Sequence, residues 1–472
     1  MAELIARFKL EPGPPAAPPR ATWLARLGHA LQRNRRPIQC VQWLFVLLYL
    51  LLLIVPAWLP LPPEQARLHD NLVRFAQFLF WGVWWPFVIL SVLLFGRLWC
   101  GIFCPEGSLS EWVSHRSRNL KPIPNWFKWP GWPFVAFLLT TIYGQLVSVY
   151  DYARPALLIL GGSTGAAMLV AFFWGKDRRI WCRYLCPVTG VFAVLSRLSP
   201  LVLRVDTARW DANKSLQQAP VLCPPLLNVR QLDSMAECHQ CMRCSGHRDA
   251  VELAWRSPHE EILRGNRALT PWHHRLLLYG MLGLASGAFQ WSVSPWLVQL
   301  KQFLAGIAVK QEWWWLLQDS PAWWLLTRYP SANDVFNWLD GLCLLIYLTV
   351  AALVIGGSVD LATRIAARLA VGRSHREVAC RLLETLTPMA GLSLFLGLSM
   401  MTVSQLAASG IQVPYLTAMR SSLLLLAYFW PAYLLWHLLD ELSVMRRGAV
   451  LLMLALGSLP WLSGWLHLFW LW

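Results

Sequence analysis

The sequence is poor in charged residues, and negative charge is the scarcer kind, with 25 Asp and Glu against 41 Lys and Arg. It also lacks a hydrolytic triad, a phosphate-binding loop and a zinc-hydrolase motif, so none of these enzyme classes is indicated. No signal peptide is apparent, because the first apolar run follows a basic, proline-rich stretch and is long enough to stay in a bilayer. These absences argue against an ordinary soluble enzyme.

Apolar residues, by contrast, are abundant: 56% of the chain is hydrophobic and 30 of its 472 residues are Trp. Such a composition is typical of a polytopic membrane protein. The net charge of +16 would suit a nucleic-acid partner, but the positive charges flank apolar runs. Membrane topology explains this pattern better, so we expect no nucleic-acid partner.

Hydrophobic runs predict a mainly α-helical membrane bundle of about nine spans. The predicted spans are approximately residues 41–61, a second ending at 95, 132–149, 156–174, 276–298, 335–357, 386–406, 423–442 and 448–468. The positive-inside rule then places most Lys and Arg on the cytoplasmic side of a bacterial inner membrane. The C-terminus is predicted to lie outside.

Four units follow from these spans. Residues 1–39 form a proline-rich, basic arm predicted to be flexible, and residues 40–196 form a four-span unit. Residues 197–274 are polar and predict a small cytoplasmic domain, and residues 275–472 carry five further spans. The Trp-rich section 311–329 is too polar to span, so we expect it in the outer membrane interface.

One short pattern occurs twice in the four-span unit, as Arg97-Leu-Trp-Cys-Gly-Ile-Phe-Cys-Pro105 and Arg179-Ile-Trp-Cys-Arg-Tyr-Leu-Cys-Pro187. Arg, Trp, both Cys and Pro keep their positions, which indicates an internal repeat. The Cys-x-x-x-Cys spacing puts two sulfurs on one helical face, and the Pro suits the start of a new helix. Each copy also follows an even-numbered predicted span, so both copies reach the same membrane face.

Eight of the eleven Cys form two candidate sets of four thiolates. The first is Cys100, Cys104, Cys182 and Cys186. The second joins Cys223, which precedes a Pro, to the run Cys238, Cys241 and Cys244. This run resembles the first three ligands of a bacterial ferredoxin, whose fourth Cys is replaced here by Arg248. We therefore expect two [4Fe–4S] clusters.

Three alternatives remain at this point. His247 competes with Cys223 as the fourth ligand of the second set, and Cys186 could serve the Cys238 run instead of its own motif. Zinc held by four Cys as a structural staple would need no redox chemistry. The lone Cys40, Cys343 and Cys380 are predicted to be buried apolar residues.

A four-thiolate cluster carries net negative charge, which nearby cations would offset. Arg97, Arg179 and Arg183 are the candidate cofactor-binding residues for this purpose. We expect no catalytic residue.

At these motifs the sequence resembles the membrane ferredoxin family that includes the NapH-type, NosR-type and CcoG-type proteins. The resemblance covers residues 39–267 and rests on the twin Cys-x-x-x-Cys-Pro motifs followed by a ferredoxin-like Cys run. It implies two [4Fe–4S] clusters that relay electrons between the quinone pool or a cytoplasmic donor and a redox partner, such as the subunits of a metalloenzyme. The flavin-bearing domain of a NosR-type protein and the extra-membrane C-terminal domain of a CcoG-type one are not seen.

The five C-terminal spans lie outside this resemblance. A rival hypothesis is therefore a transporter or a metalloenzyme assembly factor that uses the clusters as a redox sensor. The absence of charged residues deep within those spans weakens the transporter hypothesis.

Overall fold

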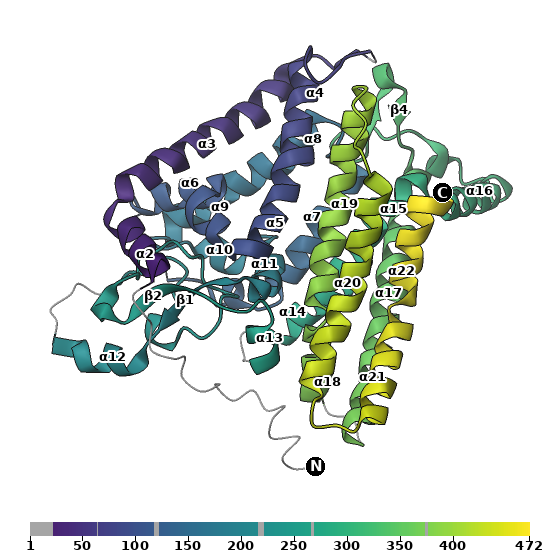
Figure 1. Cartoon of the computed structure of the whole chain (residues 1–472). Coiled ribbons are helices and arrows are strands. Elements are labelled where there is room, and N and C mark those ends of the chain that lie inside the picture. The colour runs from purple at the N-terminus through teal and green to yellow at the C-terminus, as the bar shows by residue number, and fades with distance from the viewer. Residues whose placement is uncertain (1–21, 64, 118–121, 216–220, 266–268, 373–375) are drawn as a thin grey trace.

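The computed structural model describes residues 22–472, apart from residues 64, 118–121, 216–220, 266–268 and 373–375. Helices dominate it, as the sequence predicts (Figure 1). The first 21 residues of the predicted flexible arm lie outside the described residues. From Trp23 onward the arm is helical, in α2 (Trp23–Arg33) and the start of α3 (Arg35–Trp58), so its predicted flexibility is wrong there.

Seven helices in the described part of the chain are long and apolar enough to cross a membrane. They are Arg35–Trp58, Leu72–Phe95, Ala153–Trp174, Pro271–Val293, Trp338–Val371, Thr387–Ala408 and Leu416–Leu438. An eighth span is possible if α21 (Val444–Gly457) and α22 (Leu459–Leu466), which meet at a bend of 46°, act as one. The chain is a multi-pass membrane protein.

The predicted number of nine spans exceeds this count because of α7 (Trp132–Leu146). This apolar helix has 15 residues, which corresponds to a length of about 22 Å. A bilayer core is about 30 Å thick. The last predicted span is interrupted at Ser458, and Pro460 lies in the first turn of the second helix of the bent pair.

The first Cys motif begins where α5 (Trp85–Phe95) ends at Gly96, which has φ +67°. The motif forms a π-helical turn, η2 (Trp99–Phe103), and then α6 (Pro105–Ser114). Pro105 occupies the first position of α6, as predicted for this residue. In the second copy α10 (Ile180–Tyr184) carries the motif, and α11 (Thr189–Leu195) begins two residues after Pro187.

A small lobe follows the second motif. Strand β1 (Leu201–Val205) pairs antiparallel with β2 (Val251–Trp255), and α12 (Thr207–Ala212) and α13 (Glu260–Arg264) flank the pair. The N-terminal α2 packs against β2, and Leu24 joins the lobe's core beside Leu203 and Leu253. The described part of the predicted arm is therefore a structural element of the small lobe (Figure 1).

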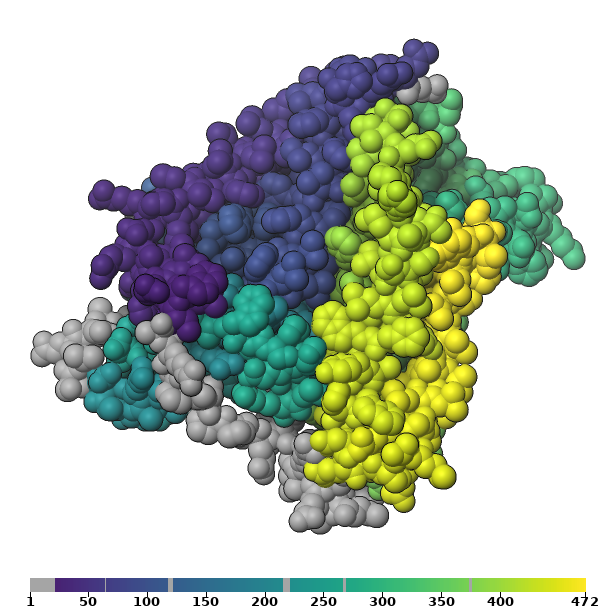
Figure 2. Space-filling view, in the orientation of Figure 1, coloured from purple at the N-terminus to yellow at the C-terminus, as the bar shows by residue number. Residues whose placement is uncertain are grey.

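The C-terminal helices form a second mass beside the N-terminal unit (Figure 2). The long α17 (Trp338–Val371) packs against η9 (Leu276–Leu284) and α21, while α19 (Thr387–Ala408) packs against α20 (Leu416–Leu438). A Cβ on Gly457 would lie 2.2 Å from the Cβ of Ala362, so a small residue is needed where α21 crosses α17. Helix α16 (Pro295–Lys310) projects from this mass, and no span occurs at residues 311–329.

Candidate metal centre

The four Cys of the duplicated motif line one cavity. Cys100, Cys104, Cys182 and Cys186 border a space of about 250 Å³ that continues between the helices, where it is lined mainly by aromatic and aliphatic side chains. Two spans deliver the motifs to this place, because each motif lies shortly after the end of one, at Phe95 or at Trp174. The structure thus brings together the first set of Cys that the sequence analysis singled out.

The sulfurs of this set are near neighbours. Burial raises the pKa of Cys104 well above the usual value, and the charges of Cys100 and Cys182 add to the rise. Burial likewise raises the pKa of Cys182 to about 12, against the opposing effect of Arg179. The pKa of Cys186 is raised by burial and further by Cys182 and Cys104. The four thiols of this set therefore interact electrostatically across one buried site.

The second set gathers in the core of the small lobe. The thiol of Cys244 interacts electrostatically with those of Cys238, Cys241 and Cys223, and burial is the main cause of its raised pKa. The run bends tightly, with positive φ at Gln240 and Met242, and the backbone N–H of Gln240 donates to the Cys238 sulfur at 3.4 Å. This tight turn helps the run from Cys238 to Cys244 to direct thiols into the core of the small lobe.

The two alternative ligand assignments involve His247 and Cys186. The ring of His247 lies against Trp210, with 4.9 Å between ring centroids. Cys186 lines the first cavity with the other Cys of the duplicated motif. Among the lone Cys, Cys343 is buried as predicted, Cys380 is half-buried and Cys40 is exposed, so the prediction for Cys40 is wrong.

The two kinds of metal centre differ in how far apart their thiols stand. A structural zinc site needs four ligands at about 2.0–2.3 Å from one ion. A [4Fe–4S] cluster binds each Cys through a different iron, so its four sulfurs stand further apart. Each group of Cys supplies four thiols, and soft thiolate donors are the ligands that iron–sulfur clusters and zinc select.

The two groups of Cys meet at Gly101. A Cβ on this residue would lie 2.2 Å from the carbonyl oxygen of His239 and 2.9 Å from the backbone nitrogen of Cys241. The backbone next to Cys100 therefore touches the backbone of the ferredoxin-like run, an approach that only glycine permits. Gly96 makes a similar contact with the side chain of Gln240.

Arg97 and Arg179 each cross from their own motif copy to the other one. Arg97 donates to the hydroxyl of Thr189 at 2.7 Å and to the carbonyl of Ala236 at 2.8 Å. Arg179 donates to the carbonyl of Cys100 and forms an ion pair of 2.6 Å with Glu111. Both guanidinium groups are buried, at 3% and 1% exposure. The arginines thus bind the two copies together.

Glu111 is a buried carboxylate that the sequence analysis missed. It pairs with Arg179 of the second motif and with Arg243, which lies between Cys241 and Cys244. Because Glu111 is on α6, directly after the first motif, it joins all three Cys segments. The sequence offered one signal for Glu111: it is an acidic residue close to a Cys motif, in a chain with few acidic residues.

Arg183 forms an ion pair of 2.6 Å with Glu237, one residue before Cys238. Both side chains are partly solvent-exposed. The second motif therefore also touches the ferredoxin-like run, but at the surface and through charge.

Comparisons with known proteins agree with this arrangement. The 4Fe-4S binding domain family matches the chain twice, at residues 77–124 and 157–205, so each match contains one motif copy and the internal repeat is confirmed. No solved structure matches the chain significantly.

Three curated proteins illustrate the similarity. The chain is 27% identical over 183 residues to the putative electron transport protein YccM of Escherichia coli, covering 34% of this chain and 50% of that protein. It is 25% identical over 189 residues to the regulatory protein NosR of Pseudomonas aeruginosa, covering 34% and 25% respectively. It is 25% identical over 146 residues to the methylamine utilization ferredoxin-type protein MauN of Paracoccus denitrificans, covering 29% and 51%.

The chain thus spans about half the length, or less, of these three relatives. The chain contains two copies of the 4Fe-4S binding domain, and over about a third of its length it is similar to ferredoxin-type and electron-transport proteins of the NosR-like kind.

Proposed function

We propose that this protein transfers electrons through two [4Fe–4S] clusters. Cys100, Cys104, Cys182 and Cys186 would hold the first cluster, and Cys223, Cys238, Cys241 and Cys244 the second. The contact of Gly101 with His239 and Cys241 carries the proposal, because it brings the backbone beside Cys100 against the segment that contains Cys238, Cys241 and Cys244. Each cluster supplies a one-electron carrier when bound.

The buried arginines suit this role. Within the described residues Arg97 has no carboxylate partner, although it is almost fully buried and its charge acts on Cys182 and Cys238. A buried cation without a counter-charge is unfavourable. The negative charge of two bound clusters would compensate Arg97, and Arg179 and Arg183 would contribute at the same boundary.

A quinone is the electron donor or acceptor that the cavity favours. Beyond the Cys, its lining includes the rings of Phe80, Trp81, Trp84 and Trp85 and the carboxylate of Glu106. Apolar walls with a few polar groups are typical of sites for small organic ligands. A quinone head group there would lie beside the first cluster, and the other end of the electron path would be a redox partner protein or metalloenzyme subunit.

The cluster-bearing side would face the cytoplasm of a bacterial inner membrane. This orientation rests on the positive-inside rule applied to the sequence. The similarity to a putative electron transport protein and to a ferredoxin-type protein of methylamine utilization supports the role in electron transfer.

Iron and acid-labile sulfide analysis of anaerobically purified protein tests the number of clusters. We expect about eight irons and eight sulfides per chain for two [4Fe–4S] centres. Cys104→Ser and Cys244→Ser should each remove about half of the iron, whereas Cys343→Ser, in a buried lone Cys, should remove none. Zinc without labile sulfide would refute the proposal.

Cluster reduction by a quinol analogue tests the cavity. Ile159→Phe fills part of it, since Ile159 lines the cavity. Leu158→Phe is the matched control. Leu158 is the neighbour of Ile159 in the sequence, but its side chain is 41% exposed and does not line the cavity. Ile159→Phe should slow reduction by quinol at least tenfold while dithionite still reduces the clusters. Equal rates in both variants would exclude this cavity as the quinone site.

A further inference from the structure

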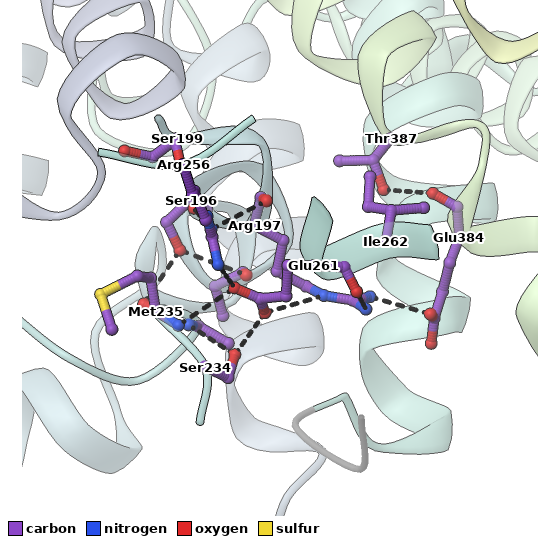
Figure 3. A network of polar contacts seen from close by, with 12 residues as sticks. Ser196, Arg197, Ser199, Ser234, Met235, Arg256, Glu261, Ile262, Glu384 and Thr387 are labelled. Carbon is purple, nitrogen blue, oxygen red and sulfur yellow. Dashed lines mark hydrogen bonds and ion pairs between the residues drawn. The ribbon is translucent and has the colours of Figure 1, made fainter. Parts of the chain in front are cut away.

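A network of buried charged side chains joins the small lobe to the C-terminal helices (Figure 3). At its centre Arg197 donates from Nε to Glu261 at 3.1 Å, and its Nη1 lies 3.0 Å from Glu384. Arg197 is fully buried, and the two carboxylates are 4% and 2% exposed. One guanidinium group therefore bridges two carboxylates from different units of the chain.

On the small-lobe side, Glu261 holds the segment that precedes Cys238. The hydroxyl of Ser234 donates to Glu261 at 2.5 Å, and the backbone N–H of Met235 donates to it at 3.3 Å. The carbonyl of Met235 accepts from the hydroxyl of Ser196 at 3.1 Å (Figure 3). Arg97 donates to the carbonyl of the next residue, Ala236. Hydrogen bonds therefore hold each of the three residues from Ser234 to Ala236, a segment that ends two residues before Cys238.

On the membrane side, Glu384 is the last residue of α18 (Arg376–Glu384), just before α19. Its carboxylate also contacts Arg381 at 3.1 Å and His274 at 3.2 Å. Arg381 in turn donates to the carbonyls of Ile262 and Leu263 in α13, each at 2.8 Å. The C-terminal unit is thus hydrogen-bonded to α13, the helix that carries Glu261.

These groups depend on one another electrostatically. Burial alone would raise the pKa of Glu384, but Arg197, with help from His274 and Arg381, holds it at about 2. The carboxylate is therefore ionised at neutral pH. Removing its charge leaves the buried Arg197 with Glu261 as its remaining carboxylate partner among those described above, so that the guanidinium charge is less well compensated.

We propose that Glu384 is a positioning residue for the second cluster, through which the C-terminal membrane unit fixes the segment before Cys238 and tunes the cluster's reduction potential. The inference rests on the proposed function, since it requires the cluster at Cys238. It gives the five C-terminal spans a part in electron transfer although they lie outside the matched domains.

Electrostatics gives the direction of the effect. Reduction adds a negative charge to a cluster, and local charge and hydrogen bonding set its potential. Neutralising Glu384 removes one negative charge and so leaves the positive charge of Arg197 less compensated. This change favours the reduced form of the second cluster, so its potential should rise.

A redox titration of the full-length protein in detergent, followed by electron paramagnetic resonance, tests the inference. Cys104→Ser and Cys244→Ser assign the signals to the two clusters. In Glu384→Gln the ratio of reduced to oxidised second cluster at a fixed potential should rise about tenfold, equivalent to about 59 mV for one electron. The first cluster should titrate as in the wild type.

Glu377→Gln is the matched control, because Glu377 is an exposed carboxylate on the same helix. It should change neither potential, and Glu384→Asp should restore most of the wild-type value. Should Glu384→Gln fail to accumulate, Ser234→Ala, which removes one hydrogen bond to Glu261, should shift the second cluster in the same direction by a smaller factor.

Two failures are distinguishable. If the wild-type protein itself lacks a second cluster, the proposed function and this inference fall together. If the wild type holds both clusters and the Glu384→Gln protein, or in its place Ser234→Ala, titrates like the Glu377→Gln control, the inference alone is overturned.

Discussion

The two copies of the Cys motif carry the same pair of Cys but have different surroundings. Counting from the second Cys of each copy, Gly107 corresponds to Thr189, and Glu111 corresponds to Ala193. Arg179 therefore meets a carboxylate on the opposite copy, whereas Arg97 meets the hydroxyl of Thr189 and a backbone carbonyl. The repeat supplies matching pairs of thiols, and the residues that differ between the copies decide where charge is compensated within the protein.

The residue after the first Cys shows the same divergence. Gly101 in the first copy allows direct backbone contact with the ferredoxin-like run, and its counterpart Arg183 reaches Glu237 by a partly exposed ion pair. The first copy is thus the one that brings the two groups of Cys together. The comparison teaches that the repeat brings the first group of Cys together, while the missing side chain at Gly101 allows the second group to lie beside it.

Gly101→Ala should have the largest effect, because the new Cβ would collide with backbone atoms of His239 and Cys241 that no side-chain rotation can relieve. We expect loss of most of the second cluster, about half of the total iron, as measured by iron analysis. Gly162→Ala, at a helical glycine with open space around its Cβ position, is the control and should retain all iron. Full iron in Gly101→Ala would contradict the role given to this contact.

Glu111→Gln should come next, because it leaves Arg179 and Arg243 without their buried charge partner. Breaking a buried pair in this way costs about 3–5 kcal/mol. The free energy of unfolding in detergent should fall by an amount of that order. The exposed Glu312→Gln serves as the comparison and should change stability very little. Equal stability of the two variants would show that Glu111 does not hold the Cys segments together.

Arg97→Lys should have an intermediate effect. A lysine keeps the charge but cannot reproduce the forked donation to both Ala236 and Thr189. Losing a hydrogen bond to a charged donor costs about 1.5–3 kcal/mol. Thermal unfolding should report a loss of this size, with the iron content retained. If the free energy of unfolding fell by less than about 0.5 kcal/mol, Arg97 would not be one of the residues that hold the two copies together.

Arg183→Gln should have the smallest effect on stability, since its pair with Glu237 is partly exposed. Exposed ion pairs contribute about 0.2–1 kcal/mol, less at high salt. Comparing the unfolding of this variant with that of Glu111→Gln at low and high salt sharpens the contrast between the two copies. A salt-independent loss larger than that of Glu111→Gln would reverse the ranking.

The repeat and the helical class could be predicted because Cys spacing and hydropathy are local properties of the sequence. The assignment of the eight Cys as ligands stays a prediction. In the structure Cys186 lines a cavity with the other Cys of the duplicated motif, and Cys223 interacts electrostatically with Cys244. The number of spans was less predictable, since α7 is too short by length alone and the last span bends at Ser458.

What the sequence could not show was the contact between distant segments. Glu111 gives no pattern of its own, and its partners Arg179 and Arg243 lie 68 and 132 residues away along the chain. The helix α2 was not predicted within the proline-rich arm, because it is stabilised by packing against β2 in the folded lobe. The ion pair of Glu384 and Arg197 was likewise not predictable, because tertiary packing brings together two units that the hydropathy pattern assigns to separate parts of the chain.

The most direct test of the central claim, that Gly101 holds two clusters side by side, is electron paramagnetic resonance during stepwise reduction of the wild-type protein. Two adjacent reduced [4Fe–4S] clusters interact magnetically, so we predict a simple spectrum at partial reduction that broadens and splits when both clusters are reduced. Two additive, unsplit signals at full reduction would contradict the contact between the two Cys groups on which the account depends.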